Sequence, residues 1–132
     1  MAGVDVEQRI SYAPTFHVVR EPSANDAALP TQKSAGLNCD EFDEVVVMVT
    51  VTGAVTAATI EPHFWAGAKN GTPNGGFVPE ATPQTISVTA AGVRKVLRVA
   101  HHDSVFFELT GLTGAGTVRI EVAGVPVFER RG

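Results

Sequence analysis

The chain has 132 residues, a formal net charge of −4 and a single cysteine, Cys39. This length favours one domain, the single cysteine excludes an intrachain disulfide, and the scattered Lys and Arg residues give no basic stripe for nucleic acid. Val, Ala, Thr and Gly are abundant, and β-branched residues favour strands over helices, so the composition predicts an all-β protein.

The N-terminal segment carries acidic residues where a signal peptide would be basic and then apolar. No apolar run approaches the length that spans a membrane. We therefore expect a soluble protein made in the cytoplasm. Residues 1–14 are expected to form an extended arm, suited to strand addition on a neighbour, or a frayed terminus. The β domain is expected to occupy 15–132.

Two long connections, 21–40 and 67–84, are rich in Gly, Pro, Asn and Ala. Ordered loops of this length in a small domain usually carry function or cover an interface. Cys39, within the first of them, is expected to be a small buried or half-buried residue rather than a reactive thiol.

The segment 44–53, "EVVVMVTVTG", reads as a strand that is apolar on both faces at its start. Four valines at alternate positions form one face. The other face begins with Val46 and Met48 and ends with threonines. Such a strand usually lies in the middle of a sheet with both sides covered, either by a loop of the same chain or by a neighbouring subunit.

The segment 56–67, "TAATIEPHFWAG", is the next expected strand, and Pro62 indicates an edge position or a bulge. Period-two alternation places Glu61, His63 and Trp65 on one face. An exposed Trp beside polar groups suits sugar stacking, whereas a Trp that anchors the core or an interface is the plainer alternative.

Two hairpins are expected in the second half of the chain. Segments 85–90 and 92–100 flank Ala91-Gly92, and segments 105–110 and 117–125 flank the glycine-rich "GLTGAG". In the last pair, alternation predicts one inward face for Val105, Phe107 and Leu109 and another for Val118, Ile120 and Val122.

The stretch His101-His102-Asp103 gathers three titratable groups between two strands. Adjacent side chains on a strand point to opposite faces, so the two histidines cannot both coordinate one metal ion there. A metal site would need further ligands, such as His63 or His17. The pattern favours a turn, and no catalytic Ser-His-Asp or Cys-His arrangement is evident, so we expect neither metal nor cofactor and no enzymatic activity.

These segments together predict a single-domain antiparallel β-sandwich with two long loops, of which the jelly roll is one form. The strand "DEVVVMVTVTG" (43–53), the Gly/Pro-rich middle loop and the ending "VFFELTGLTGAGTVRIEVAGVPV" (105–127) resemble small virion proteins of tailed bacteriophages. Capsid decoration (cement) proteins are the nearest comparison.

The resemblance implies a β-rich protein without cofactors that sits on the capsid surface as an oligomer, often a trimer, over junctions between major capsid proteins. Candidate interface residues are Val46, Met48, Trp65, Phe77 and Phe106. The main alternative is a carbohydrate-binding β-sandwich of a tail fibre or host-recognition protein, centred on Trp65, His63 and the 67–84 loop. A cupin-type enzyme is disfavoured because the histidines lack that family's spacing.

Overall fold

Nine strands and one short 3-10 helix make up the regular structure of the described chain. The computed structural model describes residues 15–40, 42, 44–66, 76–80, 84–89, 91–99 and 104–124. The elements are, in chain order, β1 (His17–Arg20), η1 (Lys33–Ala35), β2 (Leu37–Asn38), β3 (Glu44–Gly53), β4 (Ala57–Trp65), β5 (Phe77–Pro79), β6 (Ile86–Val88), β7 (Val93–Arg98), β8 (Ser104–Thr113) and β9 (Gly116–Gly124).

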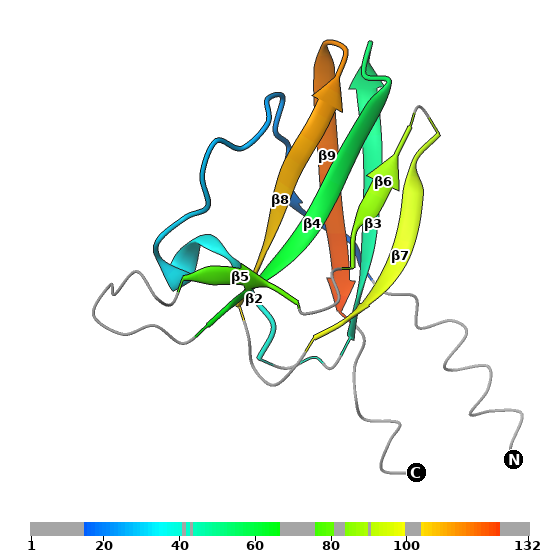
Figure 1. Ribbon diagram of the computed structural model, residues 1–132. Coiled ribbons are helices and arrows are strands. Elements are labelled where there is room, and N and C mark those ends of the chain that lie inside the picture. The colour runs from blue at the N-terminus through cyan, green and yellow to red at the C-terminus, as the bar shows by residue number, and fades with distance from the viewer. Residues whose placement is uncertain are drawn as a thin grey trace, which may run out of the picture.

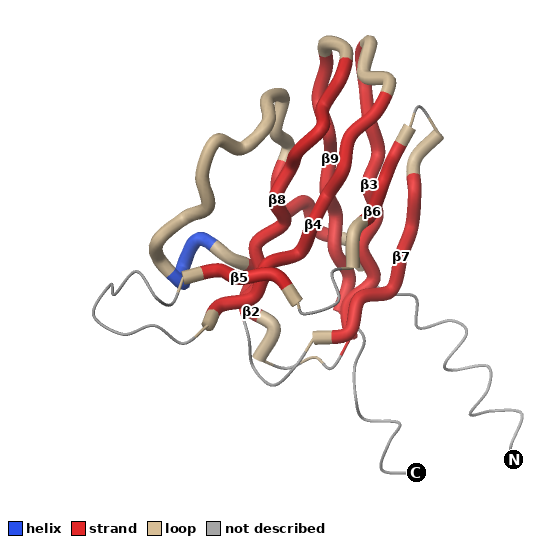
Figure 2. The backbone as a smooth tube through the Cα atoms, in the orientation of Figure 1, coloured by secondary structure: helices blue, strands red, loops and turns tan. Residues whose placement is uncertain are grey.

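The strands form two antiparallel sheets that pack face to face (Figure 1, Figure 2). Sheet A has the order β1-β9-β3-β7, and sheet B has the order β2-β8-β4-β5, with β6 also paired to β4. Successive strands alternate between the two sheets, except that β4, β5 and β6 all belong to sheet B. This alternation is the connectivity of a jelly roll. The predicted all-β sandwich is confirmed.

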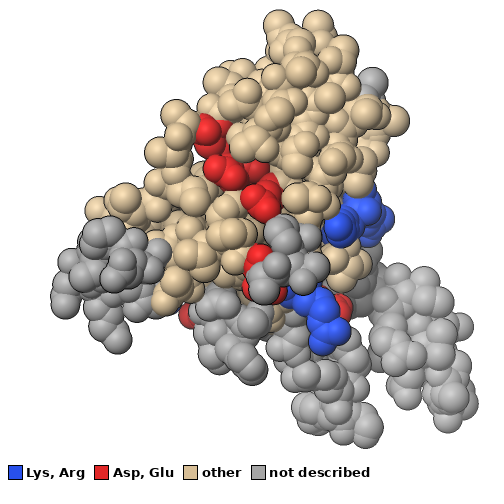
Figure 3. All heavy atoms as spheres, in the orientation of Figure 1, with Lys and Arg blue, Asp and Glu red and all other residues tan. Residues whose placement is uncertain are grey.

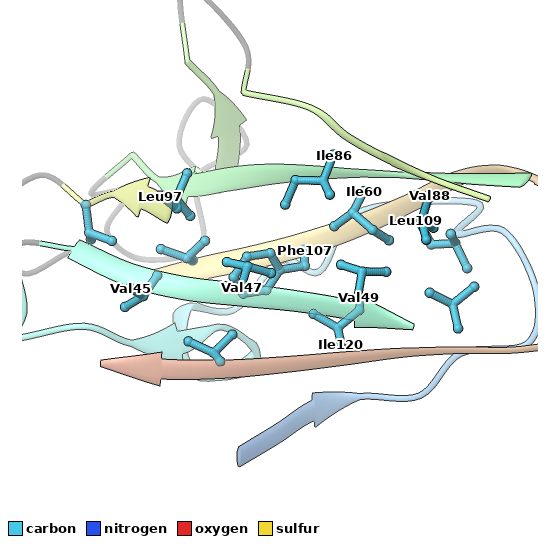
Figure 4. Close-up of a cluster of buried hydrophobic side chains, with 14 of the residues drawn as sticks. Val45, Val47, Val49, Ile60, Ile86, Val88, Leu97, Phe107, Leu109 and Ile120 are labelled. Atoms are coloured by element: carbon cyan, nitrogen blue, oxygen red, sulfur yellow. The ribbon is translucent and has the colours of Figure 1, made fainter. Parts of the chain in front are cut away.

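The core lies between the inward faces of the two sheets (Figure 4). From sheet A, β3 contributes Val45, Val47 and Val49, which are each 1% exposed or less. From sheet B, β8 contributes Phe107 and Leu109, which are buried to the same degree. These are the alternate positions that the sequence predicts to face inward. Burial of each such side chain stabilises the fold by about 1.5–3 kcal/mol.

Strand β3 lies in the middle of sheet A, as predicted. It pairs with β7 on one side and with β9 on the other, and Val46 lies opposite both Val96 and Ala123. Cys39 is fully buried against the same core, in agreement with the expected structural role of the thiol.

Both predicted hairpins are wrong, because each pair of strands is divided between the two sheets. Strand β8 pairs with β4 in sheet B, whereas β9 pairs with β3 in sheet A. Likewise β6 pairs with β4, and β7 pairs with β3. Alternation along a strand shows which side chains are buried, but it does not show which strand lies next to it.

Tight turns carry the chain from one sheet to the other at one end of the sandwich. The β3–β4 turn and the β8–β9 turn lie against each other, and the Thr56 N–H donates to the Thr113 carbonyl at 2.9 Å. Gly114 in the second turn has φ of 86°, and a Cβ there would lie 1.9 Å from the Ala54 carbonyl oxygen. Glycine is therefore required at this position for both its backbone conformation and its size.

Pro62 was predicted to mark an edge position or a bulge, but β4 lies inside sheet B, and the irregularity in its register with β8 falls between Ala57 and Thr59 instead. The setting of Pro62 nevertheless resembles an edge. Strand β6 pairs with residues 58–60 and β5 pairs with residues 63–65. Among the described residues, Glu61 and Pro62 have register partners on β8 and none on the opposite side. Proline is tolerated where a strand neighbour is missing.

The connection between β1 and β2 passes from sheet A to sheet B and covers the outer edge of β8 (Figure 1). At its start, the Val118 N–H of β9 donates to the Pro22 carbonyl at 2.9 Å. Four residues further on, the Asp26 N–H donates to the Leu109 carbonyl of β8, also at 2.9 Å. Covering of this kind protects an edge strand from pairing with other chains.

An ion pair between Arg20 and Asp26 fastens this connection. Arg20 Nη1 and Nη2 donate to Asp26 Oδ2 and Oδ1, both at 2.8 Å, in a bidentate arrangement. Arg20 also donates to the Phe107 carbonyl, and the Leu109 N–H donates to Asp26 Oδ2 at 2.8 Å. The pair therefore joins edge strand β1 of sheet A to β8 of sheet B.

The pKa of Asp26 reflects the same contacts. Burial raises it, but the hydrogen bonds from Arg20 and from the Leu109 amide, together with the guanidinium charge, outweigh burial and lower the pKa below 3.8. The ionised carboxylate is therefore the form that the fold stabilises.

At the opposite edge of sheet A, β7 carries a basic residue toward the inside of the sandwich. Lys95 lies opposite the core residue Val47, and its Nζ donates to the Thr85 carbonyl at 2.9 Å. Lys95 therefore occupies a position on the inward face of β7, where alternation would otherwise favour an apolar residue. An inward-pointing charge also discourages pairing with a foreign strand.

Several predictions fall on residues outside the described ranges. These are the extended arm 1–14, the turn at His101-His102-Asp103, and the part of the second long loop at 67–75 and 81–83.

The glycine requirement at the stacked turns can be tested by substitution. Gly114→Ala should lower the free energy of unfolding by more than 2 kcal/mol, roughly the cost of a left-handed non-glycine residue plus a displaced turn. Gly76→Ala is the matched control, since φ there is 67° and no heavy atom lies within 4 Å of the new Cβ. In urea unfolding, the control should lower the free energy of unfolding by about 1 kcal/mol. Equal decreases for Gly114→Ala and Gly76→Ala would contradict the packing argument.

The Arg20–Asp26 pair predicts a specific dependence on acid. Asp26→Asn should lower the free energy of unfolding at neutral pH by about 2 kcal/mol, because the charged acceptor of three hydrogen bonds is lost. The stabilisation from Asp26 is present above the unfolded value of 3.8 and disappears as the pH falls through the lower folded pKa. Wild type should therefore lose more stability than Asp26→Asn below about pH 4.

Glu21→Gln is the control for this prediction. The Glu21 side chain is 50% exposed and lies 3.6 Å from Arg119. Its loss should change stability by less than about 0.5 kcal/mol. Identical acid unfolding profiles for wild type and Asp26→Asn would show that the pair does not contribute.

Candidate functional site

The outer face of sheet B carries the polar residues that alternation places together on β4. Glu61, His63 and Trp65 lie on this face, as the sequence predicts, because the neighbouring positions Ile60 and Phe64 point into the core. Strand β8 adds residues of the same face through its register with β4. Glu108 lies directly opposite Glu61, and this partner comes from a segment more than 40 residues away in the sequence.

His63 is the centre of this arrangement and is only 4% exposed. Its Nδ1 lies 3.0 Å from the Glu61 carbonyl oxygen, which can only accept, so Nδ1 carries the proton. Its Nε2 lies 3.7 Å from a carboxylate oxygen of Glu61 and 3.7 Å from one of Glu108. The three side chains are called the Glu61–His63–Glu108 cluster below. Their ligand atoms lie within 4.8 Å of one another.

A row of aromatic rings continues along the same face. Trp65 packs edge-on against Phe77 with a centroid distance of 5.1 Å, and Phe77 lies 5.8 Å from Phe106. The Arg20 guanidinium lies 4.6 Å from the centre of the Phe106 ring, a cation–π contact. The Arg20–Asp26 pair thus also holds the end of the aromatic row.

Two of these rings are covered by the chain itself. Phe77 is 5% exposed and Phe106 is 9% exposed, whereas Trp65 is half-buried. The turn after η1 lies against them, since a Cβ on Gly36 would come within 2.9 Å of the Phe77 ring. Ser104 Oγ donates to the Lys33 carbonyl at 2.9 Å and holds η1 in place. Phe77 and Phe106 therefore expose little surface that a partner could contact, whereas Trp65 exposes more.

A small cavity of about 160 Å³ lies beside this row, between β1, η1 and β8. Its lining is mostly apolar, and Arg20 is the charged residue among the lining side chains. Pockets that bury drug-sized ligands are about 300–1,000 Å³ in volume. The cavity is too small for a ligand of that size.

The remaining interface candidates, Val46 and Met48, lie on the outer face of sheet A. Val46 is 9% exposed and Met48 is half-buried. Val96 on β7 is the register partner of Val46 at the edge of the sheet, and it is 52% exposed. Phe16 reaches this face as well, because the Arg94 guanidinium lies 5.3 Å from the centre of its ring. Charged residues therefore lie beside this apolar row, since Arg94 and Glu121 are the register partners of Met48.

Two features of the site were not predicted from the sequence. Alternation places Glu108 on the face opposite Val105, Phe107 and Leu109, but its place beside His63 depends on the β4–β8 register. The second feature is Arg20, whose contacts with Asp26 and Phe106 come from a long connection. The acidic Glu108 between two apolar neighbours is the one local signal that could have drawn attention to it.

The chain matches no protein-family model, no curated protein and no solved structure. The resemblance to phage decoration proteins therefore stays a prediction. Within the described ranges, no helix has the length and apolar character needed to cross a membrane.

Proposed function

We propose that this protein is a non-enzymatic virion structural protein that binds the major capsid protein of a phage and stabilises the capsid as an oligomer, with a trimer favoured. The proposal rests on the resemblance of its strands and loops to decoration proteins and on a short apolar row on the outer face of sheet A. The row consists of Ala123, Val46 and Val96, and charged residues lie beside it. That face ends at β7, an edge strand that pairs with β3 and has no second strand neighbour among the described residues.

The exposed edge of this face is suited to binding another protein. Val96 continues the apolar row that begins at Ala123 and Val46, and about half of its surface is open to solvent. A partner could bury this valine by packing against the outer face of sheet A at β7, so that apolar contact supplies the binding. Repetition of a modest contact over many symmetric copies gives strong overall attachment.

Carbohydrate binding is the second candidate, and the outer face of sheet B favours it. Trp65, His63 and Glu61 share that face, so an aromatic ring and hydrogen-bonding groups lie together. However, Phe77 and Phe106 are buried, so sugar stacking would depend on the half-buried Trp65.

Capsid binding gives a direct test. The purified chain should add in a fixed ratio to expanded capsids that lack it, from a phage whose genome encodes it, and should raise their resistance to heat. Val96→Glu should reduce this binding by roughly tenfold or more, because it places a charge in the apolar contact. Val78→Glu is the matched control, since Val78 is a 38% exposed valine of sheet B.

Absence of binding by the wild-type chain would contradict the proposal, and equal binding by both variants would contradict the role of the β7 edge. Binding to a glycan array that is lost in Trp65→Ala, without capsid binding, would support the second candidate instead.

A further inference from the structure

We propose that the Glu61–His63–Glu108 cluster is a binding site for one divalent transition-metal ion, with Zn²⁺ as the best fit. The site would join β4 to β8 on the outer face of sheet B. The inference is independent of the proposed capsid role, because it concerns the opposite face of the molecule from the β7 edge.

The first observation is a repulsion that the fold leaves in place. Glu61 and Glu108 lie directly opposite each other on neighbouring strands. Like charges in this position destabilise a sheet. Their side chains are 24% and 19% exposed, so water screens them incompletely. A positive charge between them would turn the repulsion into a favourable contact.

The second observation is the direction of His63. Its ring is buried, its Nδ1 proton is directed to the Glu61 carbonyl, and its Nε2 points between the two carboxylates. A metal-binding histidine typically donates its other N–H to a carbonyl or carboxylate in this way, which fixes the tautomer and the ring. The Nε2 lone pair is then free to bind a cation.

The distances favour an ion over a protonated histidine. A charged N–H donor and a carboxylate normally approach to about 2.7–2.9 Å. Here Nε2 lies 3.7 Å from both carboxylates and bonds to neither. Equal, longer separations leave room for an atom between the three groups. Zn²⁺ bonds of about 2.0–2.2 Å in tetrahedral geometry place ligand atoms about 3.4 Å apart. The two Nε2–carboxylate distances are close to this value, and all three ligand atoms lie within 4.8 Å of one another, so the two carboxylates would close in on the ion.

The ligand set and its accessibility also fit zinc. One imidazole nitrogen and two carboxylates supply three ligands and two negative charges, which balance a divalent ion, and water can take the fourth position. The carboxylates open to solvent while the imidazole is buried. Acidic side chains form a band on this face, over β4 and β8 (Figure 3).

Zinc binding by the untagged full chain tests the proposal. After treatment with a chelator, wild type should bind one Zn²⁺ per chain in calorimetry, and Co²⁺ should give a visible spectrum of nitrogen and oxygen ligation. Glu108→Gln and His63→Gln should weaken binding by roughly a hundredfold or more, since loss of even a supporting group costs about 10–100-fold. Glu121→Gln and His17→Asn, which alter a carboxylate and an exposed histidine of sheet A, should bind as wild type.

Thermal unfolding separates a metal site from a purely ionic triad. Without metal, Glu108→Gln should be at least as stable as wild type because the repulsion is removed, and Zn²⁺ should raise the melting temperature of wild type but not of this variant. Failure of wild type to bind Zn²⁺ or Co²⁺ would overturn the proposal. The proposal would also be overturned if Glu108→Gln were less stable than wild type by the same amount with and without Zn²⁺. That result would indicate an ionic triad of His63 with the two carboxylates instead.

Discussion

The ion pair between Arg20 and Asp26 is the contact on which the side of the sandwich beside β8 depends. Strand β1 is the edge of sheet A there, and β8 pairs with the short β2 only at Ser104 and Val105. The rest of that side of β8 would be an uncovered edge, which leaves backbone groups without partners. Asp26 bonds to both the N–H and the carbonyl of Leu109, while Arg20 holds Asp26 from β1. The connection between β1 and β2 thereby acts as a partial strand along β8.

The same contacts position the candidate site. Arg20 lies over the ring of Phe106, and Phe106 pairs with His63 across the two strands. Glu108 follows two positions along β8 and lies opposite Glu61. The outer face of sheet B is thus organised by β8, which is fixed on one side by β4 and on the other by β2 and the connection that precedes it. The outer face of sheet A differs in chemistry, since Val46 and Met48 lie there among arginines and Glu121, without a buried histidine between two carboxylates.

Side-chain alternation predicted the faces of the strands well and their neighbours poorly. It assigned the inward positions of β3, β8 and β9, and it placed Glu61, His63 and Trp65 on one face. It could not show that β8 and β9 belong to different sheets, because a glycine-rich turn can close a hairpin or cross a sandwich. For the same reason Glu108 could not be assigned to His63. That contact requires the register of two strands far apart in the sequence.

Amide hydrogen exchange tests most directly whether the connection closes the edge of β8. The Leu109 N–H donates to Asp26 Oδ2, and the Leu112 N–H donates to Asn25 Oδ1, both at 2.8 Å. Both amides should exchange slowly, at rates comparable to those of amides bonded between β8 and β4. Exchange at the rate of an open edge strand, while the β4–β8 amides stay protected, would contradict the account.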